Sequence, residues 1–427
     1  MKEKIKNLKQ TSKKDDLFDV AVIGGGPAGM MSAIKAAMTG AKVILIERNG
    51  RLGEKLLLTG KGRCNITNAE FDLKKLIKHY GPNGKFLFHA FYLFGPAKVI
   101  AFFEKLGLET KVERGNRVFP INDRSEEILE TLIRCLIEHK VKIATGKEVI
   151  GLELANRQIK KLILKNKIIL AKNYILSTGG KAYPATGSTG DGFKWATQLG
   201  HHLQEPKPAL VPIKIKEEWV KELQGLSLKN VEINIFQGQA KKDSRFGECL
   251  FTHFGLSGPI VLDISKRVGE LLKNGEVKIL LDLKPALDFT TLDERIQRDF
   301  AKYQNKSFKN SLDDLLPRKF IPVMVKLSKI NPEKKVNSVN KEERRRLVNL
   351  FKKLEMTATE LLGFDSAIVT SGGVLLEEID NKTMRSKLID NLFFAGEIIN
   401  LDGPTGGFNL QLCWSTGSLA GQSAAKE

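Results

Sequence analysis

The chain has 427 residues, of which 42% are hydrophobic, and its formal net charge is +20. This length predicts two to three domains, and the absence of any run of about 18 apolar residues argues against a membrane-spanning helix. The four cysteines lie far apart without a CxxC pair, which argues against a zinc site or a disulfide framework and indicates a reducing, cytoplasmic location.

Two segments concentrate positive charge. Residues 1–17 are predicted to form a disordered basic leader, and they do not read as a secretory signal because no apolar stretch precedes Phe18. Residues 326–353 form the second segment, which includes the run Arg344–Arg346. A basic face favours a polyanion such as RNA. A lysine-rich proteome would give the same basic drift without any function.

The sequence DVAVIGGGPAG at residues 19–29 carries a dinucleotide-binding fingerprint. Its apolar run predicts a buried parallel strand, and Gly24, Gly26 and Gly29 follow in GxGxxG spacing before a helix. The next strand, KVILIER, ends in Glu47. In this context the glycines allow a tight turn, close approach of a pyrophosphate and close helix packing, while the acid accepts bonds from ribose hydroxyls. The motif fits FAD or NAD equally well.

The loop EKLLLTGKGRCNITN at residues 54–68 follows that strand closely. It can be an anion cradle, a thiol site or an ordinary polar turn. We interpret it as a collar along the cofactor, in which Gly60 and Gly62 allow close backbone approach. Positive charge for a phosphate or a polyanionic substrate would come from Lys55, Lys61 and Arg63.

The segment KNYILSTGGKAYPATGSTGDGFKWATQLG at residues 172–200 predicts a strand and a turn beside the cofactor, then a helix. Its later glycines do not make a second fingerprint, because no strand immediately precedes them and no acid-terminated strand follows. This loop faces the substrate or the flavin, or is a purely structural turn. NAD(P)H would therefore bind transiently at a flavin, without a dedicated NAD(P)H-binding domain in the chain.

A second part of the site is predicted near the C-terminus. LFFAGE at residues 392–397 reads as a buried strand ending in a Gly–acid pair, and GPTGGFNLQL at residues 403–412 leads into a helix. Glu397 is placed to contact the ribitol or phosphate, and the N–H groups of residues 407–410 would point at the flavin pyrimidine edge. An NAD domain does not need this return of the chain, so FAD is favoured.

These stretches together resemble the BaiN/RdsA-type NAD(P)/FAD-dependent oxidoreductases, a flavoprotein family that also carries the name aminoacetone oxidase family. The resemblance runs from residue 19 to about 420 and also includes GECLFTHFGLSGP and SGGV. It implies an α/β fold with a split Rossmann-like FAD-binding domain, an inserted β-barrel-like domain and a small helical insert in that barrel. The expected domains are 18–205 with 379–427 for FAD, 206–285 with 363–378 for the barrel, and 286–362 for the helices.

The resemblance implies NAD(P)H-linked reduction of a C=C bond. Its members look associated with uridine in ribosomal RNA, which becomes dihydrouridine, or with small molecules such as enones, steroid-like acids or amino ketones. The charge of +20 favours the RNA, with residues 326–353 as the expected RNA-binding surface. A non-catalytic flavin-binding regulator is a minor alternative. No membrane partner and no metal are expected.

Uridine reduction needs a proton donor above the flavin. The candidates are Cys64, whose pKa the basic loop would lower, and His253; Tyr183 is a weaker one. Cys64 can equally be a small residue packed against the cofactor, and Cys249 and Cys413 are expected to pack in the core or on a helix. The complete set of expected cofactor-binding residues is Gly24, Gly26, Pro27, Ala28, Gly29, Glu47, Arg48, Lys55, Gly62, Arg63, Cys64, Val149, Thr178, Gly179, Gly180, Gly396, Glu397, Gly407, Phe408, Asn409 and Leu410.

Overall fold

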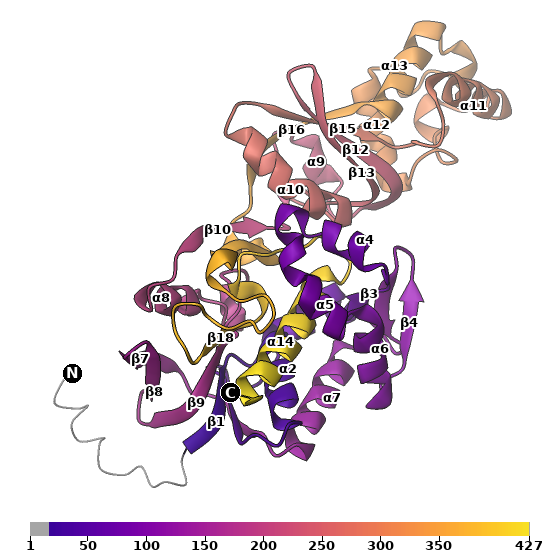
Figure 1. Cartoon of the computed structure of the whole chain (residues 1–427). Coiled ribbons are helices and arrows are strands. Elements are labelled where there is room, and N and C mark those ends of the chain that lie inside the picture. The colour runs from indigo at the N-terminus through magenta and orange to yellow at the C-terminus, as the bar shows by residue number, and fades with distance from the viewer. Residues whose placement is uncertain (1–16, 427) are drawn as a thin grey trace. The chain divides into compact units, whose positions relative to one another are not determined.

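The computed structural model describes residues 17–426, which divide into two compact units (Figure 1). Unit 1 comprises residues up to 208 and from 368 onward, and unit 2 comprises residues 209–367. The expected basic leader therefore lies outside the described residues except for Leu17, which is already the first residue of a strand. Residues 368–378, expected in the barrel domain, belong to unit 1.

The core of unit 1 is a seven-stranded sheet with the order β6-β2-β1-β9-β8-β7, in which β18 also pairs with β9. β6, β2, β1, β9 and β18 run parallel, and β8 and β7 extend the sheet antiparallel. All four residues of β2 are buried, as expected of a strand covered on both faces. The strands are β1 Leu17–Ile23, β2 Val43–Ile46, β6 Lys142–Ala144, β7 Val149–Ala155, β8 Gln158–Leu164, β9 Ile168–Leu176 and β18 Leu392–Phe394.

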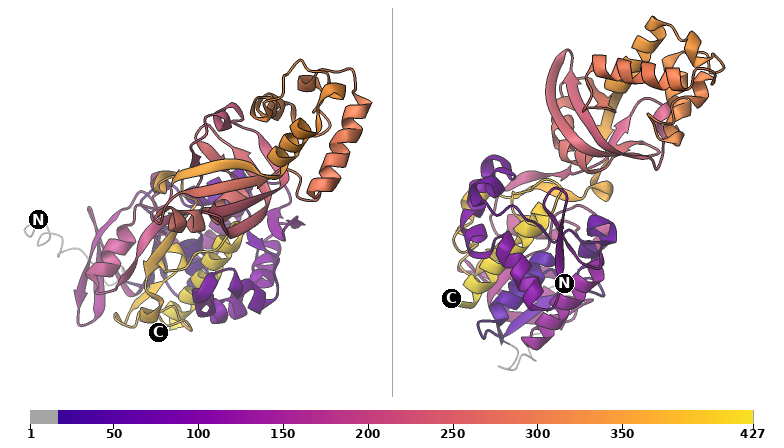
Figure 2. Two further views of the ribbon diagram at one scale, coloured as in Figure 1. Left: turned by 90° about the horizontal axis from the view of Figure 1, so that it is seen from above. Right: turned by 90° about the vertical axis from the view of Figure 1, so that its right-hand side faces the viewer.

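Two helices from opposite ends of the chain, α2 (Pro27–Ala37) and α14 (Phe408–Lys426), pack side by side in unit 1 (Figure 2). Glycines of α14 make this close approach possible. A Cβ atom on Gly417 would lie 2.5 Å from the carbonyl oxygen of Ala28, and one on Gly421 would lie 2.2 Å from that of Ser32. The C-terminal helix thereby completes the layer that the first βαβ unit begins.

Two small sheets and several short helices complete unit 1. The order β3-β5-β4 forms an antiparallel sheet, and β10 pairs with β17. The remaining elements are α3 Glu54–Leu58, η3 Thr59–Gly62, β3 Thr67–Asn68, α4 Leu73–Lys78, η4 Gly81–Leu87, α5 Phe88–Phe94, α6 Pro96–Lys105, β4 Thr110–Glu113, β5 Arg117–Pro120, α7 Ser125–Glu138, η5 Pro184–Thr186, α8 Asp191–Gln198, β10 Leu203–Ala209, β17 Val369–Val374, η10 Leu376–Glu378 and η11 Gly396–Ile398.

Unit 2 is a closed antiparallel barrel with the order β11-β14-β13-β12-β15-β16. Three longer helices, α11, α12 and α13, are inserted between β15 and β16 and group together (Figure 1). Its elements are β11 Ile213–Ile215, α9 Trp219–Glu222, β12 Ser227–Gln237, β13 Ala240–Phe251, β14 Gly255–Ser257, α10 Pro259–Leu272, β15 Val277–Asp282, α11 Phe289–Lys302, η6 Phe308–Asn310, η7 Arg318–Phe320, α12 Ile321–Ser328, η8 Val336–Ser338, α13 Lys341–Lys352, β16 Leu354–Leu361 and η9 Phe364–Ser366.

The expectation that helices continue to residue 362 is wrong. Residues 354–361, LEMTATEL, form β16, which pairs with β11 on one side and β15 on the other and so closes the barrel. Leu354, Met356 and Ala358 are buried at alternate positions, the pattern of a strand with one covered face. Residues 369–374, expected to return to the barrel, form β17 and pair with β10 instead.

One helical stretch of the described residues, Gly81–Lys105, is long and apolar enough to cross a membrane by length and composition alone. It consists of η4, α5 and α6 rather than one continuous helix. Gly95 separates α5 from α6 in an extended conformation, with φ of −80° and ψ of −176°.

Candidate functional site

The glycine-rich turn between β1 and α2 has no room for a side chain at Gly24 or Gly29, but it has open space at Gly26. Gly24 has a φ of +106°, and a Cβ atom on it would lie 2.5 Å from the carbonyl oxygen of Ser177. A Cβ atom on Gly29 would lie 1.8 Å from the Gly24 oxygen, whereas one on Gly26 would meet nothing within 4 Å. The open space at Gly26 adjoins the first N–H groups of α2, which lack partners inside the helix, so an anionic pyrophosphate fits there.

Glu47 directly follows β2 and faces the same turn. Its Oε2 accepts the N–H of Gly25 at 2.7 Å, and its Oε1 accepts the N–H of Asn49 at 2.8 Å. Each carboxylate oxygen has two lone pairs, so both keep room for a second donor. The side chain is thus held rigidly while it can still accept bonds from ribose hydroxyls.

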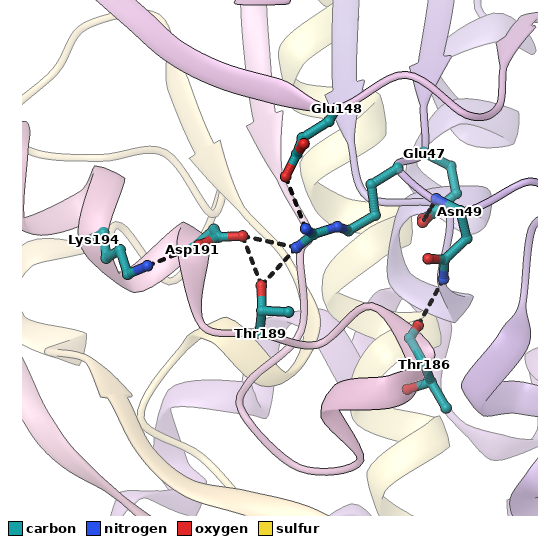
Figure 3. A network of polar contacts seen from close by, with 8 residues as sticks. Glu47, Asn49, Glu148, Thr186, Thr189, Asp191 and Lys194 are labelled. Carbon is teal, nitrogen blue, oxygen red and sulfur yellow. Dashed lines mark hydrogen bonds and ion pairs between the residues drawn. The ribbon is translucent and has the colours of Figure 1, made fainter.

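Arg48 lines the same cleft but is already engaged by protein groups. Its Nη2 donates to Glu148 at 2.8 Å, and its Nη1 donates to Asp191 at 2.8 Å and to Thr189 at 2.7 Å, within the network of Figure 3. These bonds fasten the turn after β2 to the loop that precedes α8. The arrangement makes Arg48 an organiser of the cleft wall, and its positive charge is already balanced by two carboxylates.

These elements line a cleft that is open to solvent. It lies at the carboxyl ends of parallel strands of the sheet, the usual place for a ligand in an open α/β fold. Eleven of the expected cofactor-binding residues line it: Gly24, Gly26, Pro27, Ala28, Glu47, Arg48, Lys55, Val149, Thr178, Gly179 and Glu397. The remaining expected residues do not: Gly29, Gly62, Arg63, Cys64, Gly180, Gly396, Gly407, Phe408, Asn409 and Leu410.

Sequence reasoning missed several residues of the cleft wall. Thr186 and Asp191 come from the segment of residues 172–200, and Asn49 Nδ2 donates to the Thr186 carbonyl at 2.9 Å (Figure 3). A polar residue two positions after the fingerprint acid Glu47 is the signal that points to Asn49. The other missed wall residues are Ile23, Ile46, Gly53, Glu54, Lys147, Glu148, Ser177, Gly187, Ser188, Thr189, Trp195 and Cys413.

Two buried side-chain atoms of the described residues have no hydrogen-bond partner, Thr178 Oγ1 and Asn65 Oδ1. Thr178 lies in the wall of the cleft. Leaving a buried polar atom unpaired costs free energy, so native proteins rarely tolerate it without a ligand or a water molecule. The open phosphate position at Gly26 is the feature of the cleft that fits a bound dinucleotide.

Glu397 connects the C-terminal part of unit 1 to the 54–68 loop. Its Oε2 lies 3.2 Å from Lys55 Nζ, and its Oε1 accepts the N–H of Thr370 at 2.7 Å. The preceding residue, Gly396, has a φ of +77°, and a Cβ atom on it would lie 2.6 Å from the Cβ of Ala28. Glycine is therefore required for β18 to place Glu397 beside the amino end of α2.

The amino end of α14 holds the far part of the 54–68 loop. A Cβ atom on Gly407 would lie 2.3 Å from the carbonyl carbon of Thr67, so the two backbones are in direct contact. The indole N–H of Trp414 donates to the Ile66 carbonyl at 2.9 Å. Asn409 bonds to Gly403 through both ends of its amide. The loop is thus a fixed part of the structure around the start of α14.

The expectation that basic neighbours lower the pKa of Cys64 is wrong. The Cys64 side chain is fully buried in the hydrophobic core of unit 1, and this burial raises its pKa to about 12. Arg63 is bound to Glu113 at 2.5 Å and to Asp123 at 2.6 Å, and its guanidinium stacks on the ring of Phe119. Lys55 and Arg63 of the loop are paired with carboxylates, and desolvation raises the pKa of the thiol.

The other candidate proton donors are not among the residues that line the cleft. His253 is exposed in the turn between β13 and β14 of unit 2. Tyr183 lies in unit 1 with a φ of +50°, an uncommon conformation for a residue before proline. Cys249 is buried in the barrel core, as expected. Cys413 lines the cleft, so helix packing is not its whole environment.

Within the described part of the chain, no cluster of three or more His, Cys, Asp or Glu side chains is arranged to hold a metal ion. All four cysteines are free thiols. The cleft offers glycine backbone, carboxylates, hydroxyls and two lysines, Lys55 and Lys147, as its ligand-binding groups.

Comparison with known proteins identifies relatives along nearly the whole chain. The HI0933-like protein Rossmann domain family matches residues 18–423. A 3-dehydro-bile acid delta(4,6)-reductase from Clostridium scindens is 32% identical over 95% of this chain and 99% of its own length. A ribosomal RNA dihydrouridine synthase from Escherichia coli is 29% identical over 93% of this chain and 96% of its own length.

Among solved structures, a 3-ketosteroid-Δ4-(5α)-dehydrogenase from Rhodococcus jostii has a similar fold. The TM-score is 0.56, the sequence identity is 15%, and the match covers 98% of this chain and 99% of that one. This likeness concerns the fold alone.

Proposed function

The chain belongs to the HI0933-like Rossmann-domain family of FAD-dependent oxidoreductases, and from this membership we propose that it reduces uridine in ribosomal RNA to dihydrouridine. In this reaction the C5=C6 bond of uracil gains a hydride at C6 and a proton at C5. Bound FAD supplies the hydride chemistry, with NAD(P)H as the reductant. The lack of a second fingerprint in the sequence supports transient binding of NAD(P)H.

The proposed roles of the cleft residues follow from their geometry. The open face at Gly26, at the amino end of α2, holds the pyrophosphate, and Glu47 accepts the ribose hydroxyls. Lys55, paired with Glu397 at 3.2 Å, places a cation next to the ribitol phosphates. The first N–H groups of α14 are not part of the cleft lining; they would serve the pyrimidine edge of a flavin that extends beyond it, where the helix dipole favours negative charge.

The net charge of +20 carries the choice of RNA as the substrate. Each phosphate that a protein neutralises releases counterions, so a strongly basic protein gains affinity for RNA in a way that a small acid does not require. A relative along nearly the full chain bears the name of a ribosomal RNA dihydrouridine synthase, which supports the same choice.

The decisive experiment is a dihydrouridine map of ribosomal RNA from cells that lack this gene, with complementation by the wild-type and the Gly26→Val genes. We expect one dihydrouridine to disappear and to return only with the wild-type gene. An unchanged map in the deletion strain would exclude the proposal. If the Gly26→Val gene restores the site, the nucleotide-binding assignment is wrong instead.

A second candidate function is the reduction of a C=C bond in a small enone. The observation that favours it is the 32% identity to a protein named as a bile acid reductase. It predicts NAD(P)H oxidation by the purified protein that depends on an added steroid-like enone. It also predicts an rRNA dihydrouridine map that is the same with and without the gene.

A further inference from the structure

Residues 73–103 of unit 1 combine positive charge and aromatic rings in an unusual way. They contain five lysines, two histidines and eight aromatic residues, but no aspartate or glutamate. The segment folds into α4, η4, α5 and most of α6. Because α4, η4 and α5 contact one another, their outward side chains belong to one region of surface (Figure 1).

The lysines of this region are available to an anion. Lys74, Lys75, Lys78 and Lys85 are exposed, and none of them forms an ion pair within residues 17–426. The nearest acid in the sequence, Asp72, uses its carboxylate to cap α4 through the backbone N–H groups of two of these lysines, at 2.8 and 3.1 Å. The region thus presents a cluster of exposed lysines that form no ion pair within the described residues.

Two rings stand outward on α5. Phe88 is 51% exposed and Tyr92 is 66% exposed, and their spacing of four residues puts them on one face of the helix. The opposite face, with Ala90, Phe91 and Phe94, is buried. Exposed planar rings among lysines are the groups with which proteins bind single-stranded nucleic acid, since bases stack on the rings and lysines attract phosphates.

The region is joined to the proposed flavin end of the cleft. The ring of His79, directly after α4, stacks on Phe408, the first residue of α14, with a centroid distance of 4.2 Å. The hydroxyl of Tyr80 donates to the carbonyl oxygen of Phe408 at 2.8 Å. A strand bound along α4 and α5 would therefore lie next to the helix whose amino end serves the flavin.

The basic segment 326–353 of unit 2 is less available than its sequence indicates. Lys326 pairs with Glu222, Lys334 with Glu343, Arg344 with Asp293 and Lys352 with Asp282. Four of its ten cations are thereby neutralised by carboxylates. Its one aromatic residue, Phe351, is buried, whereas Phe88 and Tyr92 are exposed, and this difference favours residues 73–103 over the segment that the sequence alone selects.

We propose that the lysine–aromatic surface, defined as Lys74, Lys75, Lys78, Lys85, Phe88 and Tyr92, binds single-stranded RNA and delivers it to the flavin end of the cleft. This inference rests on the proposed function, which requires an unpaired uridine. A lipid surface is the alternative occupant, and the test below distinguishes it from RNA.

The test measures binding of a fluorescein-labelled, uridine-containing single-stranded oligoribonucleotide to the FAD-loaded protein by fluorescence anisotropy. Tyr92→Ala and Phe88→Ala should each weaken binding by about 5- to 150-fold, the range for one lost base stack. Lys75→Ala/Lys78→Ala should weaken binding. It should also reduce the steepness of the plot of log binding constant against log salt concentration by about 1.4, since each single-strand phosphate contact contributes about 0.7 to this slope. The matched control is Lys335→Ala/Arg345→Ala, which removes the same charge from exposed positions of unit 2.

The variants must retain the FAD content and the thermal unfolding midpoint of the wild type, which their exposed positions favour. Wild-type affinity in both the ring and the lysine variants would overturn the RNA surface, as would loss of affinity in the unit 2 control alone. Loss of binding to phosphatidylserine vesicles with intact RNA binding would assign the surface to a membrane and reject the proposal. If the surface fails this test while gene deletion still removes a dihydrouridine, the proposed function survives and only the surface is wrong.

Discussion

The indole N–H of Trp414 donates a hydrogen bond of 2.9 Å to the carbonyl oxygen of Ile66, which lies 348 residues earlier in the chain. Both residues are fully buried. This bond fixes the glycine-rich 54–68 loop to the C-terminal helix, so the two ends of the sequence form one wall of the site together.

Replacing Trp414 with phenylalanine keeps an aromatic ring against Phe103 but removes the donor. The Ile66 carbonyl would then be buried without a partner, which should lower the free energy of unfolding by about 1–3 kcal/mol. Urea denaturation of the FAD-free protein measures this change. Trp219→Phe in unit 2 is the control for loss of an indole. If both variants lose the same free energy of unfolding, the hydrogen bond from Trp414 to Ile66 makes no specific contribution to stability.

The glycines of the fingerprint should differ sharply in what a side chain does. Gly29→Ala places a methyl group against the Gly24 carbonyl, with a separation of 1.8 Å before relaxation, and should cost about 3 kcal/mol or more in stability. Gly26→Val meets no protein atom and should cost only about 1 kcal/mol as a poorer helix cap. It should nevertheless purify without the visible absorbance of flavin, because its side chain fills the phosphate position. A yellow Gly26→Val protein would refute this assignment.

Cys64→Ser tests whether the buried thiol donates a proton. Loss of a general acid costs about 100-fold or more in turnover. We expect less than that, because Cys64 is fully buried and does not line the cleft. Cys249→Ser is the matched control, since burial also raises the pKa of that thiol to about 12. A loss of 100-fold or more in Cys64→Ser alone, with normal FAD content, would restore Cys64 as the donor.

His201 makes the folding stability of unit 1 depend on pH in the acidic range. Its Nδ1 lies 2.9 Å from Glu378, its Nε2 lies 2.8 Å from the Ser386 hydroxyl, and burial lowers its pKa below the ordinary value of 6.5. The unfolded chain therefore takes up a proton near pH 6.5 that the folded chain resists. This contribution to stability is present above pH 6.5 and is lost as the pH falls below it, by at most about 1.4 kcal/mol per pH unit.

Unfolding free energies measured across the range from pH 7.5 to about pH 5 should show this loss in the wild type and a flatter curve in His201→Gln. The exposed His253→Gln variant should follow the wild type. A wild-type curve that stays level through this range would contradict the inference.

The sequence was sufficient for the parts of the site that local chemistry dictates. A strand, a glycine turn, a helix and an acid lie within 29 residues, from Asp19 to Glu47. Their arrangement is therefore determined by residues that are close together in the sequence. The link of Arg48 to Asp191 spans 143 residues and leaves no local pattern, and for that reason Arg48 was expected to serve the cofactor directly. The pairing of Arg344 with Asp293 was hidden for the same reason.

The error at β16 has a different cause. Leucine, glutamate and methionine favour helices, and LEMTATEL continues a helical segment without a glycine or proline to mark a boundary. Its alternation of buried and exposed residues is the competing signal, and closure of the barrel decides between them. The prediction of a lowered pKa for Cys64 failed for a similar reason. Basic residues nearby in the sequence do not show which partners their side chains contact in the fold.

The pairing of β10 with β17 has a consequence for how this chain can be rearranged. Leu375 donates its N–H to the His202 carbonyl at 3.1 Å, and the Gly372 backbone contacts that of Glu205, so the two strands run in opposite directions. The chain leaves unit 1 and returns to it through adjacent strands. A short turn from residue 208 to residue 368 can therefore join these strands as a hairpin. Unit 2 could then be removed or replaced by another domain while unit 1 stays continuous.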